Sequence, residues 1–152
     1  MNHYIIDGNN LIGKIKSLQV LQKKDKQASR EGLVNIINRY FAGKKIKLTL
    51  HLDGYQNLQL HLSKGKIIYS DGLTADSKIR DEINQSKNPK LITLVSSDHS
   101  LINYARVNSS SVIRSEDFYK EIEKSNDGNE ESEKIQQLEK ERKVFLDLFS
   151  KK

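Results

Sequence analysis

Short apolar runs rich in β-branched residues alternate along this chain with stretches of helical spacing, and this alternation constrains the fold more than any other feature. The runs lie at residues 3–6, 46–52, 66–69, 91–95 and 111–113. Helical spacing occurs between residues 27 and 42, after Thr74, after Asp98 and from a Ser115 cap. Because strands joined by crossover helices pair in parallel, the pattern predicts a three-layer α/β fold with a central parallel sheet.

The length of 152 residues predicts one domain followed by an appendage. Residues 125–129 are all small or polar and are expected to form a linker, so the domain should span residues 1–124. Residues 130–152 have the pattern of a charged amphipathic helix, with apolar positions at Ile135, Leu138, Phe145 and Phe149. We expect this C-terminal amphipathic helix to dock on its own domain, with docking on a partner as the alternative.

The composition excludes several classes of protein. The absence of Cys rules out disulfides, thiolate metal sites and Cys nucleophiles, so any metal ion must have oxygen or imidazole ligands. His3, His51 and His61 do not have zinc-ligand spacing, so a zinc site is not expected. The N-terminus does not resemble a signal peptide, and no apolar run approaches the roughly 18 residues that span a bilayer. We therefore expect a soluble, cytoplasmic protein without a membrane partner.

The positive charge is concentrated in the first part of the chain. Residues 1–119 carry 18 Lys and Arg against 11 Asp and Glu, whereas residues 120–152 carry 8 against 9. A basic body favours a polyanionic partner such as RNA or DNA, although a solvated Lys-rich surface explains the charge equally well.

Acidic residues follow the predicted strands. Asp7, Asp53 and Asp98 come at or just after strand ends, and Asp76 lies in the first turn of a predicted helix, on the face of Ile79. In parallel α/β sheets, sites form outside the carboxyl ends of the strands, so the four acids can converge. Each alone is explained as a helix cap or a turn residue.

A cluster of carboxylates in a partly desolvated cleft repels itself unless a cation neutralises it. Oxygen ligands without Cys favour Mg²⁺ or Mn²⁺. Such an ion polarises a phosphodiester and lowers the pKa of an attacking water. The reaction class that fits the cluster is phosphodiester hydrolysis.

Three segments together resemble the YacP-like branch of the NYN domains, which belong to the PIN-like nucleases. They are residues 5–13 (IIDGNNLIG), 73–79 (LTADSKI) and 95–98 (VSSD). The resemblance implies a PIN-like, Rossmann-like fold and a metal-dependent (endo)ribonuclease that cleaves single-stranded RNA, with messenger RNA or translation as its context and the ribosome as a candidate partner. It implies that Asp7, Asp76 and Asp98 are the catalytic, metal-binding acids and that Asn10 contacts metal-bound water or phosphate. Asp53 resembles a further acidic ligand of the family.

Several residues near the predicted site are candidates for contacts with RNA. Lysines after the first segment could follow a phosphate backbone: Lys14, Lys16, Lys23, Lys24 and Lys26. Tyr55 and Tyr69 are candidate stacking surfaces for bases, or else core residues. Asp81 is expected to face solvent. The alternative to a nuclease is a non-catalytic RNA- or ribosome-binding module on the same fold.

Overall fold

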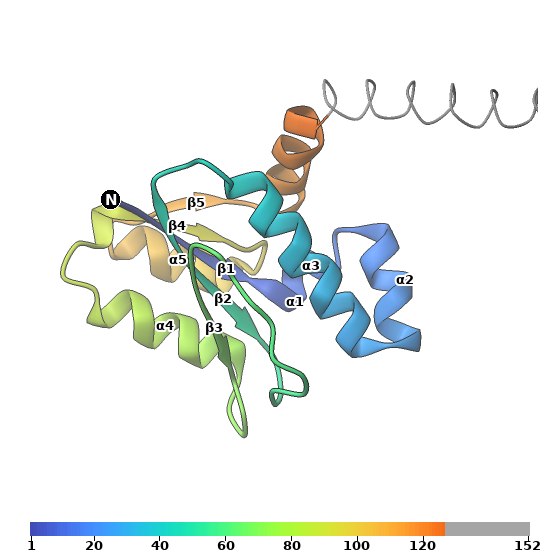
Figure 1. Cartoon of the computed structure of the whole chain (residues 1–152). Helices are drawn as coiled ribbons and strands as arrows, with labels where there is room; N and C mark the ends of the chain where they lie inside the picture. Colours follow the sequence, from blue (N-terminus) through green and yellow to red (C-terminus); the bar gives the residue numbers. More distant parts are fainter. Residues whose placement is uncertain (127–152) are drawn as a thin grey trace, which may run out of the picture. The chain divides into compact units, whose positions relative to one another are not determined.

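The computed structural model describes residues 1–126, which contain a five-stranded sheet (Figure 1). The strands are β1 (Asn2–Asp7), β2 (Ile46–Leu52), β3 (Gly65–Tyr69), β4 (Ile92–Val95) and β5 (Ser111–Ile113). Their order across the sheet is β3-β2-β1-β4-β5, and every neighbouring pair is parallel. The predicted α/β fold with a parallel sheet is confirmed.

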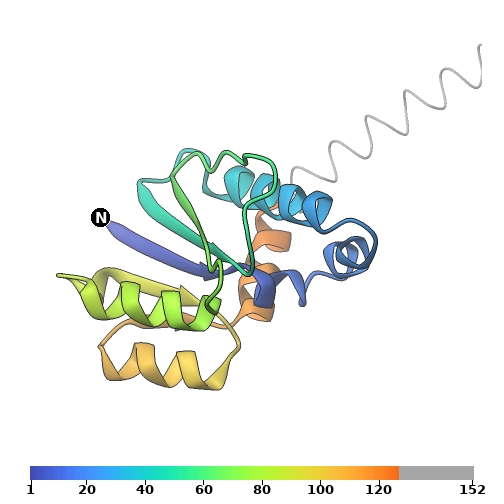
Figure 2. The same cartoon turned by 90° about the horizontal axis from the view of Figure 1, so that it is seen from below.

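Helices cover both faces of the sheet. The helices include α1 (Gly8–Ile12), α2 (Lys16–Lys24), α3 (Lys26–Phe41), α4 (Ala75–Gln85), the 3-10 helix η1 (Pro89–Leu91) and α5 (His99–Val107). In Figures 1 and 2, α4 and α5 lie side by side on one face, and α3 lies on the other. None of the helices within residues 1–126 is long and apolar enough to cross a membrane.

Successive residues of the central strand β1 pack on opposite faces of the sheet. Ile5 of β1 and Leu94 of β4 pack with Ile79 and Ile83 of α4, together with Leu101 of α5. On the other face, the rings of Tyr4 and Phe41 lie 4.9 Å apart between β1 and α3. This alternation is the normal period of a strand, and it fixes which side chains of β1 point toward α4.

A close approach of backbones positions the end of β1. A Cβ atom on Gly8 would lie 2.6 Å from the carbonyl oxygen of His51, which is closer than real Cβ atoms approach. Glycine at this position therefore lets α1 begin directly against the end of β2.

The structure adds elements that the sequence pattern did not predict. Both α1 and α2 were missed, because α1 is only five residues long and α2 fully buries only Leu18. The chain divides into two units, Met1–Tyr119 and Lys120–Lys152, and the labelled elements all lie in the first. Ser125 and Asn126, predicted to start a linker, are helical. The rest of that linker and the predicted helix at 130–152 lie outside the described residues.

Candidate functional site

The carboxyl ends of β1, β2 and β4 lie at the same edge of the sheet, and an aspartate stands at or after each (Figure 1). Asp7 is the last residue of β1, and Asp53 directly follows β2. Asp98 follows β4 after two serines and immediately precedes α5. Parallel pairing therefore brings together three of the four acids that the sequence singled out.

Asp7 is the buried member of the group. Only 9% of its surface is exposed, and the Ser96 hydroxyl donates a hydrogen bond of 2.9 Å to its Oδ2. Burial raises the pKa of Asp7 from 3.8 to about 6, because a desolvated carboxylate is costly. The hydrogen bond from Ser96 acts in the opposite direction, whereas the charges of Asp53 and Asp98 also raise the pKa. The site thus holds a carboxyl group whose pKa lies well above that of an ordinary aspartate.

Asp98 combines a structural role with a place beside Asp7. Its Oδ1 accepts a hydrogen bond of 3.0 Å from the Leu101 amide and so caps α5. Its own amide donates to the Ser96 hydroxyl oxygen at 3.1 Å. Ser96, which sequence reasoning did not identify, therefore links the two acids through one buried hydroxyl.

Asp53 ties the end of β2 to the start of α4. Its Oδ1 accepts a hydrogen bond of 3.1 Å from the Ala75 amide, at the N-terminus of α4. Its amide donates to the side chain of Asn9 at 2.9 Å. The Asp53 side chain is held in place at the edge of the site while the residue remains exposed.

The side-chain oxygen of Asn10, which was predicted to contact metal-bound water or phosphate, forms hydrogen bonds within the protein. This Oδ1 atom accepts hydrogen bonds from the Ser97 amide at 3.0 Å and from the Ser115 hydroxyl at 2.7 Å. Two protein donors thus occupy this oxygen, which secures the segment that leads to Asp98. In this arrangement, Asn10 positions the neighbouring acids.

Asp76 forms an ion pair on its own helix. It was expected on the inward face of α4, but the residue of the first turn that is buried with Ile79 and Ile83 is Ala75. The i, i+4 spacing places Asp76 beside Arg80 instead, and Arg80 Nε lies 2.7 Å from Asp76 Oδ1. Arg80 also donates to the hydroxyl of Ser100. The carboxylate of Asp76 is therefore neutralised by a neighbour on its own helix.

The predicted three-carboxylate cage of Asp7, Asp76 and Asp98 is not preformed. Within residues 1–126, no group of three or more His, Asp or Glu side chains is arranged to hold a metal ion. Mg²⁺ in proteins commonly has only one or two carboxylate ligands, with waters and substrate phosphates completing its octahedron. Asp7 with either Asp98 or Asp53 would supply such a pair of carboxylates, since the charges of both residues act on the buried Asp7.

The structure identifies neighbours for two of the predicted RNA-binding lysines. Lys26 is close to the loop after β2, since a side chain at Gly54 would begin 3.4 Å from its Nζ. Lys14 is near Glu116, whose pKa is lowered mainly by a hydrogen bond from Ser97 and further by the charge of Lys14. Lys16, Lys23 and Lys24 are exposed on α2.

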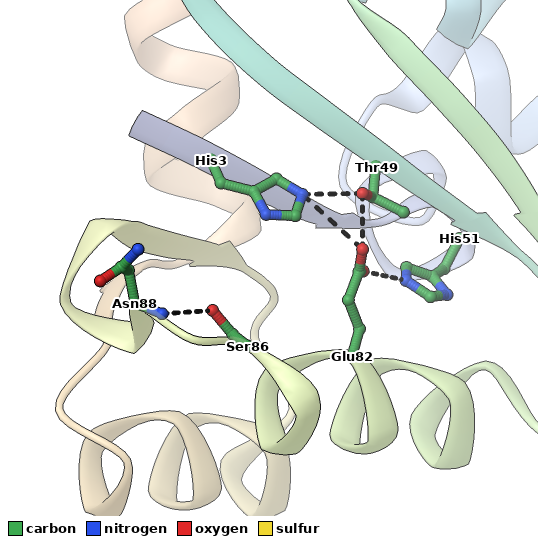
Figure 3. A network of polar contacts seen from close by, with 6 residues as sticks. All are labelled: His3, Thr49, His51, Glu82, Ser86 and Asn88. Atoms are coloured by element: carbon green, nitrogen blue, oxygen red, sulfur yellow. Dashed lines mark hydrogen bonds and ion pairs between the residues drawn. The ribbon is translucent and has the colours of Figure 1, made fainter. Parts of the chain in front are cut away.

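A second polar cluster, which sequence reasoning did not predict, lies between α4 and the sheet (Figure 3). Glu82 Oε1 lies 2.8 Å from Nε2 of His51, and Glu82 Oε2 accepts from the Thr49 hydroxyl at 2.7 Å. His3 Nε2 lies 2.8 Å from the same hydroxyl oxygen. We call these four residues the Glu82 network. The sequence feature that could have indicated this network is the position of Glu82, which lies on the inward face of a helix beside Ile79 and Ile83.

The fold is similar to crystal structures of Rae1 (YacP) from Bacillus subtilis. One has a TM-score of 0.69 at 17% identity and covers 96% of this chain and 88% of that chain. A mutant form has a TM-score of 0.67 at 18% identity and covers 81% of this chain and 75% of that one. No curated protein matches the chain. NYN domains have a nuclease-like fold related to PIN domains and are associated with RNA. Residues 4–152 match the YacP-like NYN domain, and the chain therefore belongs to that family.

Proposed function

We propose that this protein is a ribonuclease that hydrolyses phosphodiester bonds of single-stranded RNA with Mg²⁺ or Mn²⁺, in the cytoplasm. The observation that carries the proposal is the buried carboxyl group of Asp7, with the charges of Asp53 and Asp98 close enough to help raise its pKa to about 6. Folding would disfavour such an arrangement if it served packing alone. Membership of a family with a nuclease-like fold supports the same function.

The residues have distinct parts in the proposed site. Asp7, together with Asp98 or Asp53, would hold the ion, and Asp76 would join them only if its ion pair with Arg80 opened. When bound, the ion would supply Lewis acidity toward the phosphodiester and a water of lowered pKa. Ser96 fixes Asp7 and the backbone of Asp98 in one orientation, and Asn10 fixes the adjoining segment. The basic surface would attract the RNA backbone.

Cleavage of single-stranded RNA by matched variants tests the proposal. Asp7→Asn and Asp98→Asn should each reduce cleavage by orders of magnitude, because a neutral amide is a poor ligand for a hard cation. Asn is a good helix cap, so Asp98→Asn should leave α5 intact. Asp81→Asn, at an exposed position on α4, is the control and should cleave like the parent. A chelator should abolish cleavage by the parent, and Mn²⁺ or Mg²⁺ should restore it.

A non-catalytic RNA- or ribosome-binding module is the second candidate. It is favoured by the ion pair between Asp76 and Arg80 and by the absence, within residues 1–126, of a three-ligand metal group. Under this alternative, the parent would bind RNA without cutting it, and neither Asp variant would change the product pattern. Normal cleavage by both Asp variants at subsaturating metal would rule out the proposed site.

A further inference from the structure

Hydrogen bonds join the loop that begins at Asp53 to the loop that follows β3. The amide of Gly54, in the loop after β2, donates to the Ser70 hydroxyl at 2.9 Å, and the Asp71 amide donates to the Gly54 carbonyl at 2.9 Å. Gly54 has a φ of +87°, which is unfavourable for other residues and lets the chain turn back immediately after Asp53. We call residues 53–55 and 70–73 the rim.

A buried arginine forms hydrogen bonds with the backbone of this rim. Arg30 of α3 is only 3% exposed, and its guanidinium donates to the backbone carbonyls of Asp53 and Tyr55, the latter at 2.9 Å. No acidic side chain within residues 1–126 forms an ion pair with Arg30, and its Nε has no hydrogen-bond partner there. The buried guanidinium of Arg30 thus donates to two nearby backbone carbonyls, and these hydrogen bonds hold the backbone of Asp53 and Tyr55 in place.

The side chain of Tyr55 projects from this fixed backbone into solvent. Tyr55 is 67% exposed, and its hydroxyl would lie 3.6 Å from a Cβ atom on Gly72, so the ring reaches across to the other loop of the rim. Leu73 of the same loop is 62% exposed. An exposed aromatic ring on a rigid backbone, two residues after an acid of the site, is suited to contact with a flat ligand.

The structure also decides between the two tyrosines that the sequence offered as stacking surfaces. Tyr69 is half-buried in β3, and the guanidinium of Arg30 lies 5.2 Å from its ring centroid. One face of Tyr69 is therefore covered by a cation, whereas Tyr55 remains exposed. Lys26 Nζ lies close to Gly54, next to Tyr55, and adds positive charge on the same side.

We propose that Tyr55 stacks on an unpaired base of the RNA and thereby selects single-stranded substrate. The inference rests on the proposed function and deepens it. Stacking accepts any base, because every base has a flat π-surface, but it requires that the base be free of a duplex. Arg30 is then a positioning residue that holds the backbone of Tyr55 and of Asp53 in fixed relative positions.

Binding measured in chelator separates stacking from cleavage. With a labelled single-stranded oligoribonucleotide as probe, Tyr55→Ala should weaken binding roughly 5- to 100-fold. Tyr55→Phe, which keeps the ring, should bind like the parent. Binding of a duplex of the same length should be the same for all three proteins. The substitutions change an exposed side chain, so they should leave the melting temperature unchanged.

A fluorescent reporter gives a second readout, because the chain contains no Trp. The emission of the Tyr55→Trp variant should be quenched by the single-stranded oligonucleotide through stacking. Val107→Trp is the control, since Val107 is 84% exposed at the far end of α5, and the emission of this variant should not change.

The possible results discriminate between the inference and the proposed function. The inference is overturned, and the nuclease proposal stands, if the parent binds and cleaves RNA while Tyr55→Ala binds equally well and the emission of Tyr55→Trp does not respond to the oligonucleotide. If the parent binds no RNA at all, both fail.

Discussion

Asp7 is a carboxyl group whose ionisation costs free energy in the folded protein. Its pKa is raised to about 6 in the native state, against 3.8 ordinarily, first because it is buried. Between these two values, the folded protein binds more protons than the unfolded chain does. The free energy of unfolding therefore falls as pH rises from 3.8 to 6, and the full penalty of ionisation remains above pH 6.

Asp7→Asn should remove this penalty. In chelator at about pH 8, we expect the variant to be more stable than the parent by up to about 3 kcal/mol, since each unit of pKa shift corresponds to about 1.4 kcal/mol. The Asn side chain can still accept the hydrogen bond from Ser96. Urea unfolding at several pH values would measure the difference, which should shrink toward zero near about pH 4. A variant that is less stable than the parent at every pH would instead show that the carboxylate makes a contact the fold needs.

At the residue scale, the sequence predicted which acids stand at strand ends but not what each one binds. Asp7, Asp53 and Asp98 are placed by strand length and parallel pairing, which periodicity shows. The pairing of Asp76 with Arg80 depends on how α4 is rotated about its axis. Ala75 lies on the buried face with Ile79 and Ile83, whereas Asp76, one residue later, lies beside Arg80. The role of Ser96 could not be predicted, because a short polar residue after a strand has no distinctive pattern.

At the scale of elements, α4 is anchored to the sheet by polar as well as apolar contacts. Ile79 and Ile83 are buried on either side of Glu82, whose carboxylate contacts Thr49 and His51 (Figure 3). Burial acts to raise the pKa of Glu82, but the hydrogen bonds from His51 and Thr49 prevail, so its pKa lies below the usual value. The charged form of Glu82 thus stabilises the attachment of α4, whose first residue is held by Asp53.

Glu82→Ala should destabilise the protein by about 2 to 4 kcal/mol, since it leaves Nε2 of the buried His51 without its partner and removes one of the two partners of the buried Thr49 hydroxyl. Asp81→Ala, one position along the same helix but exposed, is the matched control and should change stability by no more than about 0.5 kcal/mol. Because the native pKa of Glu82 is lowered, the part of the loss that depends on its charge is present above pH 4.5 and should disappear as pH falls below that value. Urea unfolding of both variants across this pH range would measure the losses, and equal losses would refute the role of the Glu82 network.

The elements themselves were predictable where apolar periodicity was strong. The strand β2 matched its predicted range of residues 46–52, and α3 and α4 began within a residue of expectation. The polar residues Thr49 and His51, which alternate with leucines in β2, have the pattern of a solvent-facing side. The structure buries them under α4, because Glu82 supplies hydrogen bonds that only the tertiary fold can bring there.

At the scale of the whole molecule, lysines lie both at the carboxyl-end edge of the sheet, where the acids are, and at the opposite edge, formed by the amino ends of the strands. Lys26 belongs to the edge with the acids, through its position beside Gly54. Lys47 and Lys87 line a pocket with His3 at the amino ends of the strands, and the charge of Lys66 also acts on His3. Net charge alone does not distinguish these edges, but RNA that passes the acids should contact only one of them.

Two triple replacements test where the RNA lies: one combines Lys26 with its sequence neighbours Lys23 and Lys24 of α2, and the other takes three lysines from the amino ends of the strands. Lys23→Gln, Lys24→Gln and Lys26→Gln combined should weaken RNA binding and reduce the slope of log affinity against log salt by up to about 2, since each phosphate contact on a single strand contributes about 0.7. The matched control combines Lys47→Gln, Lys66→Gln and Lys87→Gln, which removes the same charge from the other edge and should leave the slope nearly unchanged. Titrations of a single-stranded oligonucleotide in chelator, from low to moderate salt, would measure both slopes. Equal reductions in the two variants would mean that the basic body attracts RNA through its overall charge, without a defined path past Asp7, Asp53 and Asp98.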